Sequence, residues 1–118
     1  MAKFEKFEDI LAWQKSRMLI GRIYLLFQNS RDYSFRDQIQ RATVSIMNNI
    51  AEGYERKGNK EFAKFLYIAK GSCGEVRSML YLALDLSYID KKEFDDLHTK
   101  TTEISRMLSG LIKTLQTY

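Results

Sequence analysis

Hydrophobic residues recur every three or four positions along four stretches of the chain, and short polar breaks separate these stretches. Such spacing places the apolar side chains on one face of an α-helix. It predicts helices at about residues 8–29, 35–53, 60–88 and 91–116. Short connections favour antiparallel neighbours. The pattern therefore predicts an all-α fold, an antiparallel up-down-up-down four-helix bundle made of a single domain over residues 1–118.

The last stretch has the most regular pattern. Its seam follows alternating three- and four-residue steps through Phe94, Leu97, Thr101, Ile104, Leu108, Leu111, Leu115 and Tyr118. Asp90, with Glu93 three positions later, is typical of a capping box that begins a helix. By the same kind of reasoning, Ser34 is expected to cap the second helix and Gly53 to end it.

Small residues occupy the middle of the third stretch, where Gly71 and Gly74 lie close together. Two glycines cost a helix about 1–2 kcal/mol, so either the helix breaks here or another backbone crosses close by. The apolar register continues unchanged through both glycines. We therefore expect an unbroken helix with a close crossing.

The first stretch is apolar on more than one side. One line contains Leu11, Met18 and Leu25, and a second contains Trp13, Ile20, Tyr24 and Phe27. A stripe this wide exceeds what one face of a bundle needs. Because large apolar patches rarely stay bare on a monomer, it predicts contact with another chain.

The amino-acid composition excludes several kinds of site and segment. The 118 residues are 45% hydrophobic and 29% charged and contain no proline, which suits a soluble protein of a few long helices. One cysteine, Cys73, and one histidine, His98, can form neither an intrachain disulfide nor a Cys/His zinc site. No stretch is long and apolar enough for a membrane span or a signal peptide. We expect a cytoplasmic protein without metal or cofactor.

The net charge of +4 comes from the first 60 residues and permits a polyanionic partner. Arg56, Lys57, Lys60 and Lys64 lie within nine residues at one predicted end of the bundle. Tyr54 beside them is a candidate for stacking on a base, as is Tyr33 beside Arg31 and Arg36. The alternative interpretation is a solvated loop. A symmetric ring would favour binding, because it repeats the cations around one rim and creates a field for phosphates.

A polar edge runs along the second predicted helix, through Gln38, Arg41, Ser45, Asn49 and Glu52. Glu52 and Glu75 are the candidates for paired carboxylates, but the Glu-x-x-His motif of di-metal bundles is missing. We therefore interpret Arg41, Asn49, Glu52 and Glu75 as a structural polar network at a helix or subunit junction. We expect Cys73 to be a small buried hydrophobe rather than a redox group. Without a nucleophile, base and oxyanion set, an enzyme is disfavoured.

Particular residues carry a resemblance to a known family. They form three runs: Phe7 to Lys15; Gln38-Ile39-Gln40-Arg41-Ala42 with Ser45-Ile46 and Asn49-Ile50-Ala51-Glu52-Gly53; and Phe62 to Leu66 with Ala69-Lys70-Gly71-Ser72 and Glu75. With these residues the chain resembles the four-helix-bundle proteins encoded in intervening sequences of bacterial 23S ribosomal RNA genes. The resemblance implies a ring-shaped homopentamer in a bacterial cytoplasm. The family is also similar in fold to the accessory protein of diversity-generating retroelements, which binds nucleic acid and a reverse transcriptase.

The leading hypothesis from the sequence is a non-enzymatic, oligomeric protein associated with RNA or DNA, as a ribonucleoprotein accessory factor. Its expected partners are copies of itself, RNA or DNA, and a nucleic-acid-processing protein. The alternative is a scaffold whose ring presents helix faces to a partner protein without binding nucleic acid.

Overall fold

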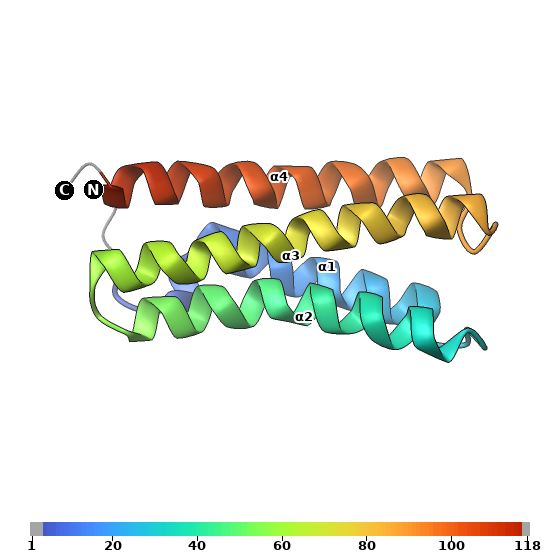
Figure 1. Ribbon diagram of the computed structural model, residues 1–118, viewed down its shortest axis with the longest axis horizontal. Helices are drawn as coiled ribbons and strands as arrows, with labels where there is room; N and C mark the ends of the chain where they lie inside the picture. Colours follow the sequence, from blue (N-terminus) through green and yellow to red (C-terminus); the bar gives the residue numbers. More distant parts are fainter. Residues whose placement is uncertain (1–3, 117–118) are drawn as a thin grey trace.

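A computed structural model describes residues 4–116 of the chain, which form a short 3-10 turn and four long helices (Figure 1). The elements are η1 (Phe7–Asp9), α1 (Leu11–Phe27), α2 (Tyr33–Glu55), α3 (Asn59–Asp85) and α4 (Lys91–Gln116). Each helix packs against the next one in the chain, and α1 closes the bundle against α4. The body measures 45 × 20 × 19 Å. The predicted all-α, up-down four-helix bundle is confirmed.

The core runs along the axis of the bundle. The largest of its fully buried side chains are Ile10, Leu19, Ile23, Ile39, Ile46, Ile50, Leu66, Val76, Leu80, Leu97, Ile104 and Leu108. The predicted seam of α4 is buried from Phe94 to Leu115 apart from the half-buried Leu111, whereas Tyr118 lies outside the described residues. The buried hydroxyls of Ser16, Thr43 and Thr101 each donate to the carbonyl four residues earlier, so they cause no unsatisfied polar group.

Side-chain caps mark the N-termini of α2 and α4. The capping box before α4 is confirmed, because the Glu93 amide donates to Asp90 Oδ1 at 2.7 Å and the Asp90 amide to Glu93 Oε1 at 2.9 Å. The predicted cap Ser34 is wrong. The cap is Asp32, whose carboxylate accepts from the Phe35 amide at 3.1 Å.

The helix ends differ from the prediction because two residues other than glycine adopt the left-handed conformation. Gly53 was expected to end α2, but the helix continues to Glu55, and Lys57 at φ 66° ends the turn. Ser87 at φ 61° ends α3 in the same way, with the Tyr88 amide donating to the Ala83 carbonyl at 2.8 Å. Helix ends of this kind cannot be predicted from the positions of glycine in the sequence.

The close approach of α2 and α3 is found at a different glycine from the one predicted. A Cβ added to Gly53 would lie 2.6 Å from the Cβ of Phe65, whereas a Cβ at Gly71 or Gly74 would meet nothing within 4 Å. Helix α3 is unbroken, as expected, but no backbone crosses at its glycines. Beside Gly71, the hydroxyls of Ser45 in α2 and Ser72 in α3 lie 2.9 Å apart.

The first predicted helix begins later than expected. Ile10 is extended at φ −76° and ψ 118° and separates η1 from α1. Figure 1 shows that η1, the α2–α3 turn and the last turn of α4 share one end of the bundle, which we call the turn end. The α1–α2 and α3–α4 connections lie at the opposite end.

Candidate functional site

The predicted cations at the α2–α3 turn differ in what they contact. Arg56 donates to Glu52 Oε2 at 2.9 Å, and its guanidinium lies 5.0 Å from the ring centre of Phe65. The hydrogen bond to Glu52 is the main cause that raises the pKa of Arg56. Its charge is therefore partly neutralised by its own helix. By contrast, Lys57, Lys60 and Lys64 form no ion pair with a carboxylate among residues 4–116.

Tyr54 is built into the bundle rather than exposed for stacking. Its hydroxyl donates to the Phe4 carbonyl, and its ring meets Phe62 edge-on with 5.9 Å between centroids. The ammonium of Lys57 lies 5.5 Å from the centre of the same ring. The protein's own groups therefore contact the ring that was predicted to stack on a base, and Tyr54 is half-buried rather than fully exposed.

Arg36 does not belong to the same patch. It lies in the first turn of α2, so about 30 Å of helix separates it from Arg56. Its guanidinium binds Asp37 at 3.1 Å and covers the ring of Tyr33 at 4.9 Å. The structure therefore places this candidate nucleic-acid contact at the opposite end of the bundle.

Lys60 and Lys64 line a hollow of about 600 Å³ between the start of α3 and the end of α4. Tyr67 of α3 and Leu115 and Gln116 of α4 also line it. Tyr67 is not among the site residues predicted from the sequence. The i, i+4, i+7 spacing of Lys60, Lys64 and Tyr67 could have indicated it, because such residues share one face of a helix.

The predicted polar network does not form within one chain. Arg41, Glu52 and Glu75 are exposed, and no hydrogen bond or ion pair joins any two of the four predicted members among the described residues. Asn49 donates to the carbonyl and hydroxyl of Ser45 at 2.8 and 2.9 Å. The buried interpretation is wrong for the isolated chain, because these side chains lie on the outer edge of the α2–α3 contact.

Two of the four members nevertheless face one surface hollow. Arg41 of α2 and Glu75 of α3 line a cavity of about 170 Å³ together with Gln38 and Ser45. Their opposite charges face a common space without a direct ion pair in the described structure.

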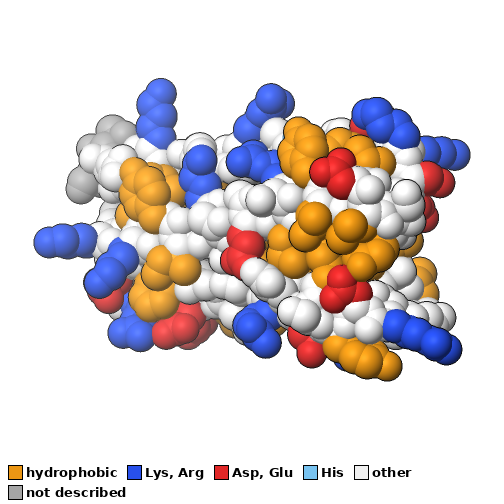
Figure 2. All heavy atoms as spheres, turned by 45° about the vertical axis from the view of Figure 1, so that its right-hand side comes forward, with side chains coloured by type: hydrophobic (Ala, Val, Ile, Leu, Met, Phe, Trp, Pro, Cys, Tyr) orange, Lys and Arg blue, Asp and Glu red, His pale blue; other side chains and the backbone are white. Residues whose placement is uncertain are grey.

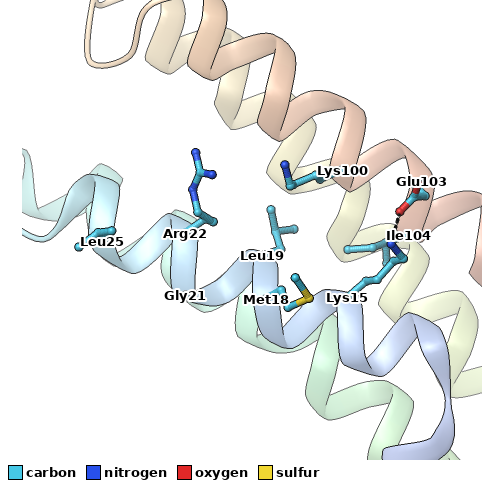
Figure 3. A pocket seen from close by; sticks show the side chains of 9 residues that line it. All are labelled: Lys15, Met18, Leu19, Gly21, Arg22, Leu25, Lys100, Glu103 and Ile104. Atoms are coloured by element: carbon cyan, nitrogen blue, oxygen red, sulfur yellow. Dashed lines mark ion pairs between the residues drawn. The ribbon is translucent and has the colours of Figure 1, made fainter.

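The outer face of α1 carries the apolar surface expected from the sequence. Leu11, Met18 and Leu25 follow a seven-residue spacing and are 52%, 69% and 66% exposed. Beside them a groove of about 420 Å³ runs between α1 and α4, where Leu19 of α1 and Ile104 of α4 form its floor (Figure 3). The surplus apolar face of the first helix is confirmed.

Charged side chains border this groove in pairs. Lys15 lies 3.0 Å from Glu103, the pair marked in Figure 3, and Arg22 lies 3.2 Å from Asp96. Lys100 also binds Asp96, and this bond is the main cause that lowers the pKa of Asp96. The border is therefore largely neutral. On the face shown in Figure 2, cationic and acidic side chains are interspersed, and hydrophobic side chains reach the surface between them.

The Cys73 thiol and the His98 imidazole both pack against other groups of the bundle. Burial raises the pKa of Cys73 to about 12, so its thiol stays protonated and unreactive. His98 packs against Tyr81 and Phe94 with ring centroids 5.6 and 5.3 Å apart. Across residues 4–116, no three His, Cys, Asp or Glu side chains come together as a metal site would require. In the same part of the chain, every helix is too short or too polar to span a bilayer.

The opposite end of the bundle contains a second feature that sequence reasoning missed. The Tyr88 hydroxyl donates to Asp32 Oδ2 at 2.6 Å and thereby ties the α3–α4 connection to the cap of α2. This bond, followed by the bond from the Phe35 amide, lowers the pKa of Asp32, and the same contact raises the pKa of Tyr88. Because Asp32 and Tyr88 are 56 positions apart, no local sequence pattern could predict this hydrogen bond.

The chain is similar to a known protein family and to a solved protein structure. The family model described as 23S rRNA-intervening sequence protein matches residues 8–110. A crystal structure of a protein with unknown function from the S23 ribosomal protein family of Bacteroides thetaiotaomicron VPI-5482 superposes with a TM-score of 0.81. It is 26% identical, and the match covers 87% of this chain and 96% of that one. No match was found among curated proteins.

Proposed function

The chain belongs to the 23S rRNA-intervening sequence protein family. From this premise we propose that it is a non-enzymatic, oligomeric protein that binds nucleic acid. We propose that the nucleic acid is chiefly RNA and that the protein acts as a ribonucleoprotein accessory factor. The observation that carries the proposal is the set of three lysines at the turn end, Lys57, Lys60 and Lys64. They form no ion pair with a carboxylate in the described chain. When such lysines neutralise phosphates, the counterions condensed on the nucleic acid are released, which favours binding.

A single copy offers only a weak field. Glu55 and Glu61 lie among the lysines, and Arg56 is paired with Glu52. We therefore propose that binding depends on assembly into a homopentamer of about 70 kDa, five times the 13.9 kDa of one chain. A closed ring repeats the lysines around one rim, so that several phosphates are neutralised at once.

The exposed stripe of Leu11, Met18 and Leu25 supplies the apolar surface for this assembly. Each of these side chains gains about 1–2 kcal/mol when a neighbouring subunit buries it. The polar edge around Arg41 and Glu75 supplies the second face. Opposite charges that flank a hollow can pair with the matching groups of an adjacent copy.

The proposal is tested by fluorescence anisotropy with a labelled RNA at low ionic strength. We expect the wild type to bind and the variant Lys57→Glu with Lys60→Glu to lose most of the affinity. The matched control is Lys91→Glu with Lys92→Glu, two exposed lysines at the other end of the bundle, which should bind like the wild type. Equal binding by all three proteins would contradict a role for the turn end.

The second candidate is a protein-interaction scaffold without affinity for nucleic acid. It is favoured by the groove between α1 and α4, whose floor is apolar and whose bordering cations are all paired with carboxylates. An intact oligomer that binds no RNA or DNA at low salt would favour the scaffold over the first candidate.

A further inference from the structure

The hollow at the turn end combines three kinds of side chain that a single strand of nucleic acid needs. Lys60 and Lys64 provide positive charge, Tyr67 provides an aromatic ring, and Asn59 and Gln116 provide amide groups. Its volume of about 600 Å³ lies within the range of ordinary ligand sites. The hollow is formed by α3 and α4 of the same chain, so it exists in each copy without assembly.

Tyr67 is held in place while much of its surface stays open. Its hydroxyl accepts a hydrogen bond from Gln116 Nε2 at 3.2 Å, and the residue is 52% exposed. Tyr54 differs in this respect, because core groups and Lys57 surround its ring. A partly exposed ring that is fixed at its polar end can accept a base on its face at a low cost in side-chain entropy.

The two lysines lie on the same face of α3 as this ring. Lys60 and Lys64 are four residues apart and Tyr67 follows three residues later, so the three side chains form one row about 10 Å long. Successive nucleotides of one strand are about 3.4 Å apart when stacked, so the row spans about three nucleotides. Neither lysine has a carboxylate partner within residues 4–116. Among residues 4–116, Glu61 at the border is the one acidic side chain that lines the hollow.

We propose that this hollow binds single-stranded nucleic acid, with a base stacked on Tyr67 and the adjoining phosphates on Lys60 and Lys64. The inference rests on the proposed function and makes it more specific. A duplex keeps its bases paired and stacked inside, so it cannot place a base on the ring. The site therefore distinguishes a single strand from a duplex, whereas a purely electrostatic rim would not.

The experiment uses the full-length chain and fluorescein-labelled oligonucleotides of about 12 nucleotides, a length typical of single-strand sites. Three probes are compared at low salt: oligouridine, oligothymidine, and a duplex of mixed sequence. Tyr67→Leu removes the ring, and Tyr67→Phe keeps the ring but loses the hydroxyl. The matched control is Tyr81→Leu, since Tyr81 lies on the same helix, is 54% exposed and is remote from the turn end.

We expect both single strands to bind more tightly than the duplex. Tyr67→Leu should weaken binding of the single strands by about 5- to 150-fold, the range observed when one base loses its aromatic partner. Tyr67→Phe should retain most of the affinity, and Tyr81→Leu should match the wild type. Lys60→Gln with Lys64→Gln should weaken both single strands, and comparison of the RNA and DNA probes identifies which of them the site prefers. Circular dichroism and light scattering verify that each variant keeps its fold and its oligomeric mass.

The outcomes separate the two proposals. If the wild type binds the strands and the duplex equally and Tyr67→Leu has no effect, the stacking site is wrong while nucleic-acid binding by the turn end stands. If none of the probes binds, both the site and the proposed function fail. If Tyr81→Leu weakens binding as much as Tyr67→Leu does, the ring of Tyr67 has no special role and the site is again overturned.

Discussion

Replacement of Gly53 by alanine tests whether α2 and α3 approach as closely as the structure places them. Alanine is ordinarily the better helix residue by about 1 kcal/mol, so the substitution would stabilise an open helical position. At Gly53, however, the new Cβ would lie 2.6 Å from the Cβ of Phe65 and 3.2 Å from Cδ1 of Phe62. The Phe65 atom is attached directly to the backbone of α3, so no side-chain rotation relieves the contact.

The magnitude follows from two opposing terms. Overpacking of a tight core costs about 1–3 kcal/mol, and the gain in helix propensity offsets about 1 kcal/mol of that cost. The net cost is then about 0–2 kcal/mol. Since the contact can relax only if the helices separate, we expect the upper part of this range, a fall of about 1–2 kcal/mol in the free energy of unfolding. The matched control is Gly110→Ala, because a Cβ at this exposed position of α4 meets nothing within 4 Å. The control should gain up to about 1 kcal/mol.

Urea unfolding followed by circular dichroism measures both variants against the wild type at one protein concentration. The two should differ by about 2–3 kcal/mol in the free energy of unfolding, equivalent to a difference of roughly 8 °C or more in Tm. If Gly53→Ala stabilises the protein as much as Gly110→Ala does, the close approach of α2 and α3 is wrong.

Three further predictions concern other surfaces. Met18→Glu places a charge in the exposed apolar stripe of α1, so light scattering should show the mass falling from about 70 kDa towards the 13.9 kDa of one chain; an unchanged oligomer would exclude this face as the interface. Glu52→Ala removes only an exposed i, i+4 pair with Arg56, so urea unfolding should change by less than about 1 kcal/mol; a loss of about 3–5 kcal/mol would reinstate a buried network. Tyr88→Phe removes the main cause that lowers the pKa of Asp32 below its ordinary value of 3.8. The wild type should therefore lose stability as the pH falls through the lowered pKa, and the variant should lose less over the same acidic range; identical pH profiles would contradict this linkage.

The fold could be predicted from the sequence because its information is local and periodic. The apolar seam of α4 and the capping box at Asp90 and Glu93 are both visible within a few residues, and both are confirmed. The family resemblance is confirmed as well. The ends of α2 and α3 were missed because Lys57 and Ser87 adopt a conformation that glycine usually provides, and hydrogen bonds to preceding carbonyls compensate its cost there.

The candidate site was less predictable, since it depends on how distant segments meet. Arg36 and Arg56 look equivalent as cations in a sequence, yet one α-helix places them at opposite ends of the bundle. Tyr54 looks like a loop aromatic, but the extension of α2 to Glu55 brings it against Phe4 and Phe62. Tyr67 is not recognisable as a site residue from the sequence, because its helical spacing does not reveal that α4 ends beside it.

The central claim is that the assembled lysines of the turn end bind nucleic acid through its phosphates, and the salt dependence of RNA affinity tests it most directly. If each of five subunits neutralises one or two phosphates, the slope of log affinity against log salt concentration should be about −4 to −9. Lys57→Glu with Lys60→Glu should remove most of this slope without changing the mass of the oligomer, because both side chains are exposed. Its Tm should fall by only a few degrees, because the interaction that is lost is the contact of Lys57 with the Tyr54 ring. A wild type whose RNA affinity is independent of salt, or that binds no RNA at low ionic strength, would contradict the claim.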